Sequence, residues 1–138
     1  MSIHNYPFVS LANSLLVLRV AVAIFFMAHA VVRVVTDTIP LFALFLTNKG
    51  IPFSFAVVWL ITVYELGAGL LMALGHWVRL MTVGFQAIAG GGIVLIHANL
   101  GWFVGEHGIG GMEYSLCLMV ALLVIAASDV ESGKSSTH

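Results

Sequence analysis

The chain has 138 residues, of which 61% are apolar and only 8% are charged, and its net charge is −1. A soluble domain of this length carries about 25% charged residues, so the composition indicates a polytopic membrane protein with a single domain. No basic patch suggests nucleic-acid binding, and the single cysteine, Cys117, excludes an internal disulfide or a Cys-x-x-Cys redox centre.

Four apolar runs are long enough to cross a bilayer, which takes about 20 helical residues. They cover Leu11 to about Val35, Phe53 to Leu74, Arg79 to about Asn99, and about Met112 to Ser128. Between the first two runs, Leu41–Leu46 is too short to cross and is expected to lie at the membrane interface or to re-enter. Gly75–Val78 is a tight connection, so the second and third spans should form an antiparallel hairpin.

The predicted fold is therefore all-α, an antiparallel bundle of four transmembrane helices with a short interfacial segment between spans one and two. Residues 1–128 form its single domain, and 129–138 form a flexible polar C-terminal tail. An even number of spans places both termini on one side. The few Lys and Arg residues beside the spans are divided equally between the two sides, so they leave the orientation open.

Glu65 is the only charged side chain between Phe53 and Leu74. A charge near the middle of a bilayer costs roughly 2.5 kcal/mol unless it is paired or neutralised, so we expect a partner for this carboxyl group. Counted from the span ends, Arg19 and Glu65 both lie at a depth of roughly 12–14 Å. The sequence therefore predicts that Arg19 pairs with Glu65.

The polar residues of each span share one face when each residue is advanced by about 100°. Such faces turn toward a bundle interior, because lipid offers polar groups no partner. The residues are Arg19, His29 and Arg33 on the first span; Thr62, Glu65, Gly69 and His76 on the second; Arg79, Gln86, Gly90 and His97 on the third; and Glu113 and Cys117 on the fourth.

Two polar clusters are expected from these faces. One is the Arg19–Glu65 pair, and the other joins His29, His97 and Glu113 beneath a loop that carries Glu106 and His107. Structural alternatives stay open: the pair fixes helix register, the basic residues at span ends anchor the interface, and glycines permit close helix packing. The histidines are metal ligands, with Glu113 as a third candidate, or hydrogen-bonded neutral groups in a proton path.

Several stretches carry a family resemblance. They are Leu18-Arg19-Val20, Phe26-Met27-Ala28-His29, Gly50-Ile51-Pro52, Glu65 to Leu71, Gly101-Trp102-Phe103, and Gly110 to Tyr114. In this order, over about residues 11–128, they resemble the DoxX family of small four-helix bacterial membrane proteins. Ala30 departs from the pattern, because members often have glycine there. The resemblance implies a multi-pass protein of the bacterial cytoplasmic (inner) membrane with a quinone-linked redox role.

Three functions fit these observations. The first is a membrane oxidoreductase subunit that binds quinone among the spans and receives electrons from a partner redox subunit, a bound substrate, or a haem or metal for which no specific motif is present. Glu65, His29, His97 and Glu113 would carry protons, Arg19 and Arg79 would hold developing negative charge, and Gln86, Gly69 and Gly90 would line the quinone slot. The second is a non-catalytic assembly or stabilising subunit of a larger complex. The third is a small-solute or proton pathway with Glu65 as its relay.

Overall fold

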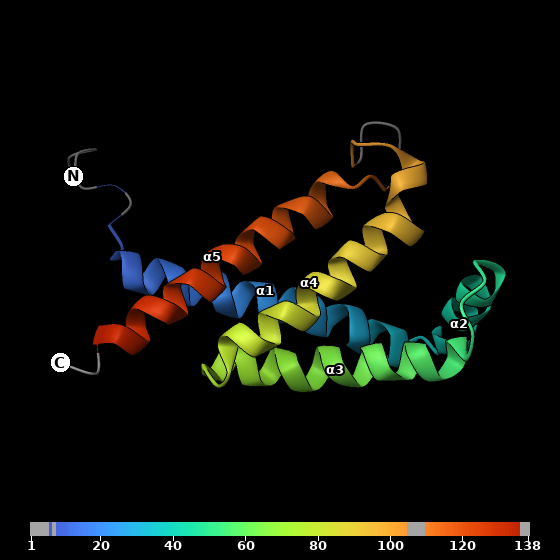
Figure 1. Cartoon of the computed structure of the whole chain (residues 1–138), viewed down its shortest axis with the longest axis horizontal. Helices are drawn as coiled ribbons and strands as arrows, with labels where there is room; N and C mark the ends of the chain where they lie inside the picture. Colours follow the sequence, from blue (N-terminus) through green and yellow to red (C-terminus); the bar gives the residue numbers. More distant parts are fainter. Residues whose placement is uncertain (1–5, 7, 105–109, 136–138) are drawn as a thin grey trace.

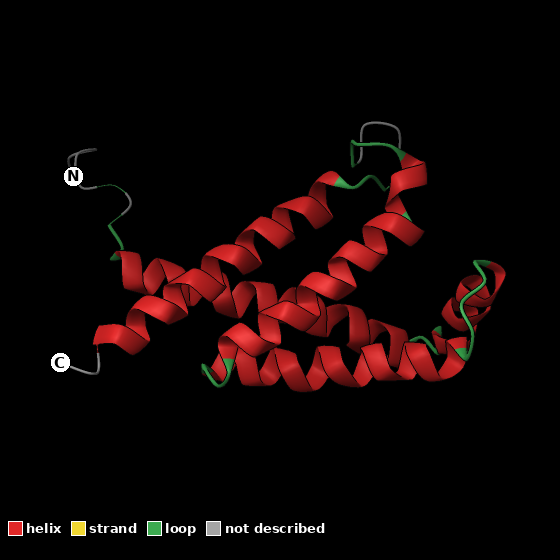
Figure 2. Ribbon diagram, in the orientation of Figure 1, coloured by secondary structure: helices red, strands yellow, loops and turns green. Residues whose placement is uncertain are grey.

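The computed structural model describes residues 6, 8–104 and 110–135, the last six of them by their backbone alone. The described ranges contain helices and loops only, which confirms the all-α prediction (Figure 2). Glu106 and His107 lie outside the described residues. The elements are α1 (Leu11–Val35), α2 (Ile39–Asn48), α3 (Ser54–Leu74), α4 (Val78–Leu95), the 3₁₀ helix η2 (His97–Leu100) and α5 (Glu113–Ser135).

Local sequence explains where two of these helices begin or end. Ser10 caps α1, because its hydroxyl accepts a hydrogen bond from the Asn13 backbone N–H. Helix α3 ends at Gly75, which has φ +83° and donates its N–H to the carbonyls of Leu71 and Met72. This left-handed conformation suits glycine and lets the chain reverse into α4 within three residues. The predicted hairpin of the second and third spans is confirmed.

In the part of the chain that the structure describes, three helices, α1, α3 and α4, are long and apolar enough to cross a membrane, and α2 is a shorter apolar helix. With ten residues, α2 is about 15 Å long and cannot span the bilayer. The fourth predicted span lies in α5. This helix continues to Ser135, so the backbone is helical beyond Ser128, where we placed the start of the polar tail.

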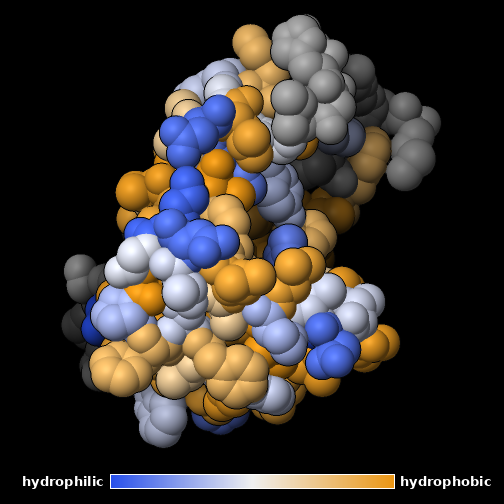
Figure 3. Space-filling model, turned by 90° about the vertical axis from the view of Figure 1, so that its right-hand side faces the viewer, coloured by the Kyte–Doolittle hydropathy of each residue, from blue (hydrophilic) through white to orange (hydrophobic). Residues whose placement is uncertain are grey.

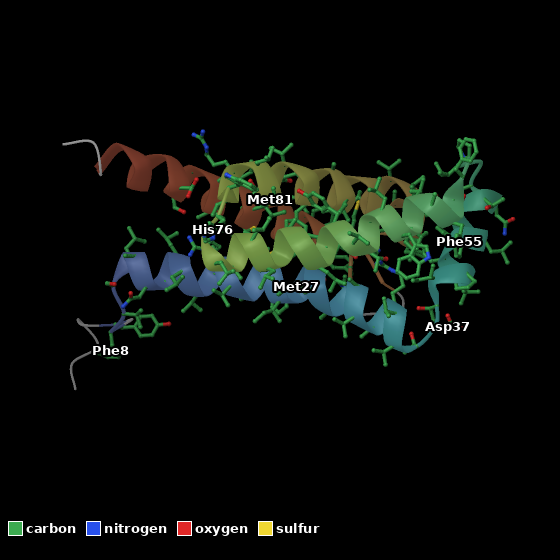
Figure 4. The ribbon with its side chains drawn as sticks, turned by 90° about the horizontal axis from the view of Figure 1, so that it is seen from below. Phe8, Met27, Asp37, Phe55, His76 and Met81 are labelled. Atoms are coloured by element: carbon green, nitrogen blue, oxygen red, sulfur yellow. The ribbon has the colours of Figure 1, made fainter. Side chains whose placement is uncertain are left out.

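The long helices form two antiparallel pairs, α1 with α3 and α4 with α5, which cross each other (Figure 1). The start of α1, the α3–α4 turn and the end of α5 lie toward one end, which we call the terminal end. Helix α2, η2 and the start of α5 lie at the other, the loop end, where the two pairs diverge. Seen from below, His76 marks the terminal end of the α3–α4 hairpin, whereas Asp37 and Phe55 mark the loop end (Figure 4).

The main core lies where the two helix pairs cross. It is built from Val22, Ala23 and Phe26 of α1, Ala68 and Met72 of α3, Val78, Met81, Phe85 and Ala89 of α4, and Leu118, Leu122 and Ile125 of α5. The rings of Phe26 and Phe85 lie 4.3 Å apart between centroids. Tyr64 packs directly against Gly84 and donates its hydroxyl to the Met81 carbonyl, which closes the α3–α4 interface.

A second, smaller core holds α2 in place at the loop end. Ile39, Ala43 and Leu46 of α2 pack on Val58 of α3 and are buried. This cluster fixes α2 to the side of α3. As a result, a face of α2 meets the end of α1, where the candidate site lies.

Candidate functional site

Glu65 is buried in the bundle, with 3% of its surface exposed, and its partner is Arg33. The Arg33 Nη1 lies 2.9 Å from Glu65 Oε2 and 2.7 Å from the Thr62 hydroxyl. The prediction that an intramembrane guanidinium on α1 pairs with this carboxylate is therefore right, but the choice of Arg19 was wrong. The pair links α1 to α3 in the loop half of the molecule.

The error came from the assumption that α1 and α3 end at the same level. Arg19 instead lies beside the end of α3, where its Nη2 is 3.2 Å from the position that a Cβ on Gly75 would occupy. Measured along the helices from the level of Arg19 and Gly75 toward the loop end, Glu65 lies at about 15 Å and Arg33 at about 21 Å. The α1 helix thus extends about 12 Å beyond α3 at the terminal end.

The backbone positions of Arg33 and Glu65 thus differ by about 6 Å along the helix axes, and the direction of their side chains makes up this difference. Helical side chains lean toward the N-terminus of their own helix. Because α1 and α3 are antiparallel, Arg33 leans toward the terminal end and Glu65 leans toward the loop end. The two groups therefore approach each other from either side of one level.

Arg33 uses one nitrogen for both hydrogen bonds. The Thr62 hydroxyl donates in turn to the Val58 carbonyl, so its lone pairs face Arg33. Within the described residues, Nε and Nη2 of Arg33 make no hydrogen bond. The guanidinium carbon lies 5.3 Å from the centroid of the Phe42 ring, a cation–π contact from α2. Arg33 is thus held on one edge and has free donors on the other.

A cavity of about 610 Å³ opens beside this pair, and we call it the inner cavity. Its polar lining comprises His29, Arg33, Glu65, His97, Tyr114 and Ser115. Its apolar lining comprises Phe26, Phe42, Leu46, Ile51, Val57, Ile61, Ala87, Ile88, Ala89, Gly91, Gly92, Leu95, Ile96 and Leu118. Ligand sites have this size and this mixture of apolar walls with a few polar groups. Seen from the loop end, hydrophilic residues form a band between more hydrophobic surfaces (Figure 3).

His97 adds an unusual polar group to the inner cavity. Its Nδ1 is buried and has no hydrogen-bond partner among the described residues. Buried polar atoms without a partner are rare, and they often mark a place where a ligand or water completes the bond. Helix α4 ends at Leu95, so His97 lies on η2 rather than on the straight helix that we predicted to continue to Asn99.

A shallower hollow of about 400 Å³, the outer groove, lies between α1 and α2. It is lined by His29, Val32, Arg33, Thr38, Leu41, Phe42 and Phe45. His29, Arg33 and Phe42 also line the inner cavity, so the two hollows adjoin across these three side chains.

Five of the other predicted site residues lie away from the inner cavity. Arg19 is level with the end of α3, and Arg79 is exposed in the first turn of α4. Gln86 donates from Nε2 to the Met119 carbonyl and so joins α4 to α5. A Cβ on Gly69 would lie 2.5 Å from Met27 Cγ, and one on Gly90 would lie 4.0 Å from Met119 Cε. Apart from the exposed Arg79, these residues contact neighbouring helices.

The predicted cluster of His29, His97 and Glu113 is only partly assembled. Both histidines line the inner cavity, whereas Glu113 Oε1 accepts a hydrogen bond from the Val104 backbone N–H in the loop. Among the described residues, no group of three or more His, Cys, Asp or Glu side chains could hold a metal ion.

Sequence reasoning placed Thr62 on the polar face of Glu65 but gave it no role in the site, and it missed Phe42. Thr62 precedes Glu65 by three residues on the same helical face, a spacing that brings side chains together. That spacing was a usable signal for a hydroxyl beside the carboxylate. Phe42 carried no such signal, because its position depends on how α2 folds back against α3.

One comparison with known proteins identifies a family. The family model DoxX matches residues 14–98, which is more than half of the chain and includes most of α1, all of α2, α3 and α4, and His97. Comparisons with curated proteins and with solved structures give no match. The resemblance that we described in the loop and in α5 lies beyond the matched range. Since the match contains Arg33, Thr62 and Glu65 together with most of the inner cavity, the protein that carries this site belongs to the DoxX family.

Proposed function

We propose that the protein is the integral membrane subunit of a quinone-linked oxidoreductase in the bacterial inner membrane, and that the inner cavity binds the quinone ring. The observation that carries this proposal is Arg33, which is fixed by Glu65 and Thr62 and keeps unpaired donors at the wall of a cavity of about 610 Å³. Family membership supports the membrane setting.

The cavity lining matches what a quinone needs. The flat apolar ring would lie between aliphatic walls, and the free nitrogens of Arg33 would donate to one carbonyl oxygen. That oxygen gains negative charge as electrons arrive, so a fixed guanidinium stabilises the reduced ring more than the oxidised one.

Reduction of a quinone to a quinol consumes two electrons and two protons. In this proposal Glu65 and His97 relay the protons, because both line the cavity, and each must take up a proton from water before it passes one to the ring. The electrons come from a partner redox subunit. The reverse sequence would oxidise a quinol and return both protons to the same groups.

The same ion pair also favours a second candidate, a non-catalytic assembly subunit. Arg33 and Glu65 join α1 to α3, and a buried ionic link of this kind can fix helix register without any ligand. In that case the loss of Arg33 would lower the yield of folded protein and leave no bound molecule to lose.

Quinone retention in purified protein tests the proposal. The protein is expressed in quinone-containing bacterial membranes, and the lipids that copurify are extracted and quantified for wild type, Arg33→Gln and Arg19→Gln. We expect a stoichiometric quinone in wild type and in Arg19→Gln. The quinone dissociation constant of Arg33→Gln should rise at least about tenfold, the effect of losing roughly 1.4 kcal/mol of charge-assisted hydrogen bonding, so its occupancy should fall below that of the other two proteins.

The two arginine variants are matched, because each removes one guanidinium from α1. Wild-type protein without quinone, or equal occupancy in the two variants, would contradict the proposal. A fall in the yield of folded Arg33→Gln, together with a quinone-free wild type, would favour the assembly role.

A further inference from the structure

We infer that the outer groove between α1 and α2 holds the hydrocarbon chain of the ligand whose ring occupies the inner cavity, so that the protein binds a long-chain lipid quinone. This inference rests on the proposed function and adds to it the class of ligand and the path of its chain. It makes α2 part of the binding site as well as an interfacial element.

The first observation is continuity. The inner cavity and the outer groove share three lining side chains, His29, Arg33 and Phe42. A molecule longer than a single ring that is bound at Arg33 would therefore extend into the groove past the Phe42 ring.

The second observation is the chemistry of the groove. Beyond the shared residues, its walls are mainly apolar, with Val32 on α1 and Leu41 and Phe45 on α2. Val32 is 57% exposed and Leu41 is 67% exposed, so the groove faces outward beside α1, a helix long enough to cross a membrane. A hydrocarbon chain that leaves along this path passes from the ring site directly into lipid.

A chain that left the inner cavity toward the loop end would pass polar groups. The band of hydrophilic residues at that end would expose a hydrocarbon chain to polar surroundings (Figure 3). A competing apolar exit passes Ala87, an exposed residue of α4 that lines the inner cavity but not the groove. The two exits make different predictions for substitutions.

The experiment compares two probes, a benzoquinone without a chain and the same ring with a decyl chain, bound to protein in nanodiscs. Val32→Trp places a large ring in the groove. Val31→Trp is its control, because Val31 is 48% exposed on the same turn and lines neither hollow. Leu41→Trp fills the groove from α2, and Ala87→Trp fills the competing exit.

We expect Val32→Trp and Leu41→Trp to weaken binding of the decyl probe by about tenfold, the usual penalty for overfilling a packed space. They should leave binding of the chain-free probe within about twofold. Val31→Trp and Ala87→Trp should change the ratio of the two affinities little. The use of two groove variants on different helices protects the test against misfolding of either one.

The possible results separate the two proposals. If wild type binds neither probe, the quinone function and this inference both fall. If wild type binds the chain-free probe but the groove variants change the affinities for both probes by the same factor, the inference alone is wrong. If Ala87→Trp rather than Val32→Trp discriminates between the probes, the chain leaves past Ala87 and the groove is not its path.

Discussion

The terminal half and the loop half of the bundle use the same helices in different ways. Where the pairs cross, glycines bring helices into close contact, as at Gly84 against Tyr64, and Phe85 and Met72 are fully buried. Where the pairs diverge, a cavity of about 610 Å³ remains, and a buried ion pair rather than aliphatic packing joins α1 to α3. Close packing at one end allows the other end to stay hollow and polar.

Two arginines of α1 show this contrast most directly. Arg33 in the loop half is hydrogen-bonded to Glu65 and Thr62. Arg19 in the terminal half lies beside the end of α3, and its buried Nε has no hydrogen-bond partner among the described residues. A guanidinium at that place faces the negative end of the α3 dipole, an interaction weaker than a buried ion pair.

The largest expected effect comes from removal of one guanidinium from each half. Arg33→Met should lower the free energy of unfolding by about 3 kcal/mol, because it leaves the Glu65 carboxylate buried without a partner. Arg19→Met should lower it by less than about 1 kcal/mol. Unfolding of both variants in detergent micelles measures the difference. Equal losses would mean that the ion pair does not hold the loop half together.

An intermediate effect is expected from glycine substitutions in the two halves. A Cβ on Gly84 would overlap the Tyr64 hydroxyl, so Gly84→Ala must displace that ring from the Met81 carbonyl. We expect a loss of about 2 kcal/mol in unfolding free energy. Gly91→Ala is the control, because nothing lies within 4 Å of its Cβ position, and it should be neutral or stabilising by up to about 1 kcal/mol. Similar stabilities for the two variants would show that the halves are packed alike.

The smallest effect concerns two buried threonines. Thr62 accepts a hydrogen bond from another helix, whereas Thr82 only donates to the Arg79 carbonyl on its own helix. Thr62→Val should cost about 0.6 kcal/mol, the average for a hydrogen bond between membrane helices, and Thr82→Val should cost less. Thermal unfolding of both variants, together with Arg33→Met/Thr62→Val, would show whether the threonine acts through Arg33. Additive effects of the two substitutions would contradict that coupling.

Much of the fold could be predicted because apolar length and turn residues determine it locally. The run from Leu11 to Val35 became α1 with the predicted bounds, and Gly75 gave the hairpin. The polar faces were also informative, since His29, Glu65 and His97 all line one cavity. These features depend on helical periodicity and on the cost of exposing polar groups to lipid.

The identity of the ion pair could not be predicted in the same way. Arg19 and Arg33 lie on one face of α1, so periodicity does not choose between them, and the choice depends on how far α1 slides along α3. That offset depends on contacts between residues far apart in the sequence, including the packing of α2 on Val58. The end of α4 at Leu95 likewise moved His97 off the face shared with Gln86, which points to Met119 instead.

The Arg33–Glu65 pair also fixes the axial position of α1 relative to α3. A displacement of α1 by a single helical turn, about 5.4 Å, would pull the guanidinium out of reach of both oxygens that it touches. The same movement would separate Arg19 from the end of α3 and would separate Met27 from Gly69, against which it packs. The contacts of Arg19, Met27 and Arg33 along α1 are therefore all compatible with a single axial position of this helix. That position determines how deep the inner cavity lies below the membrane surface.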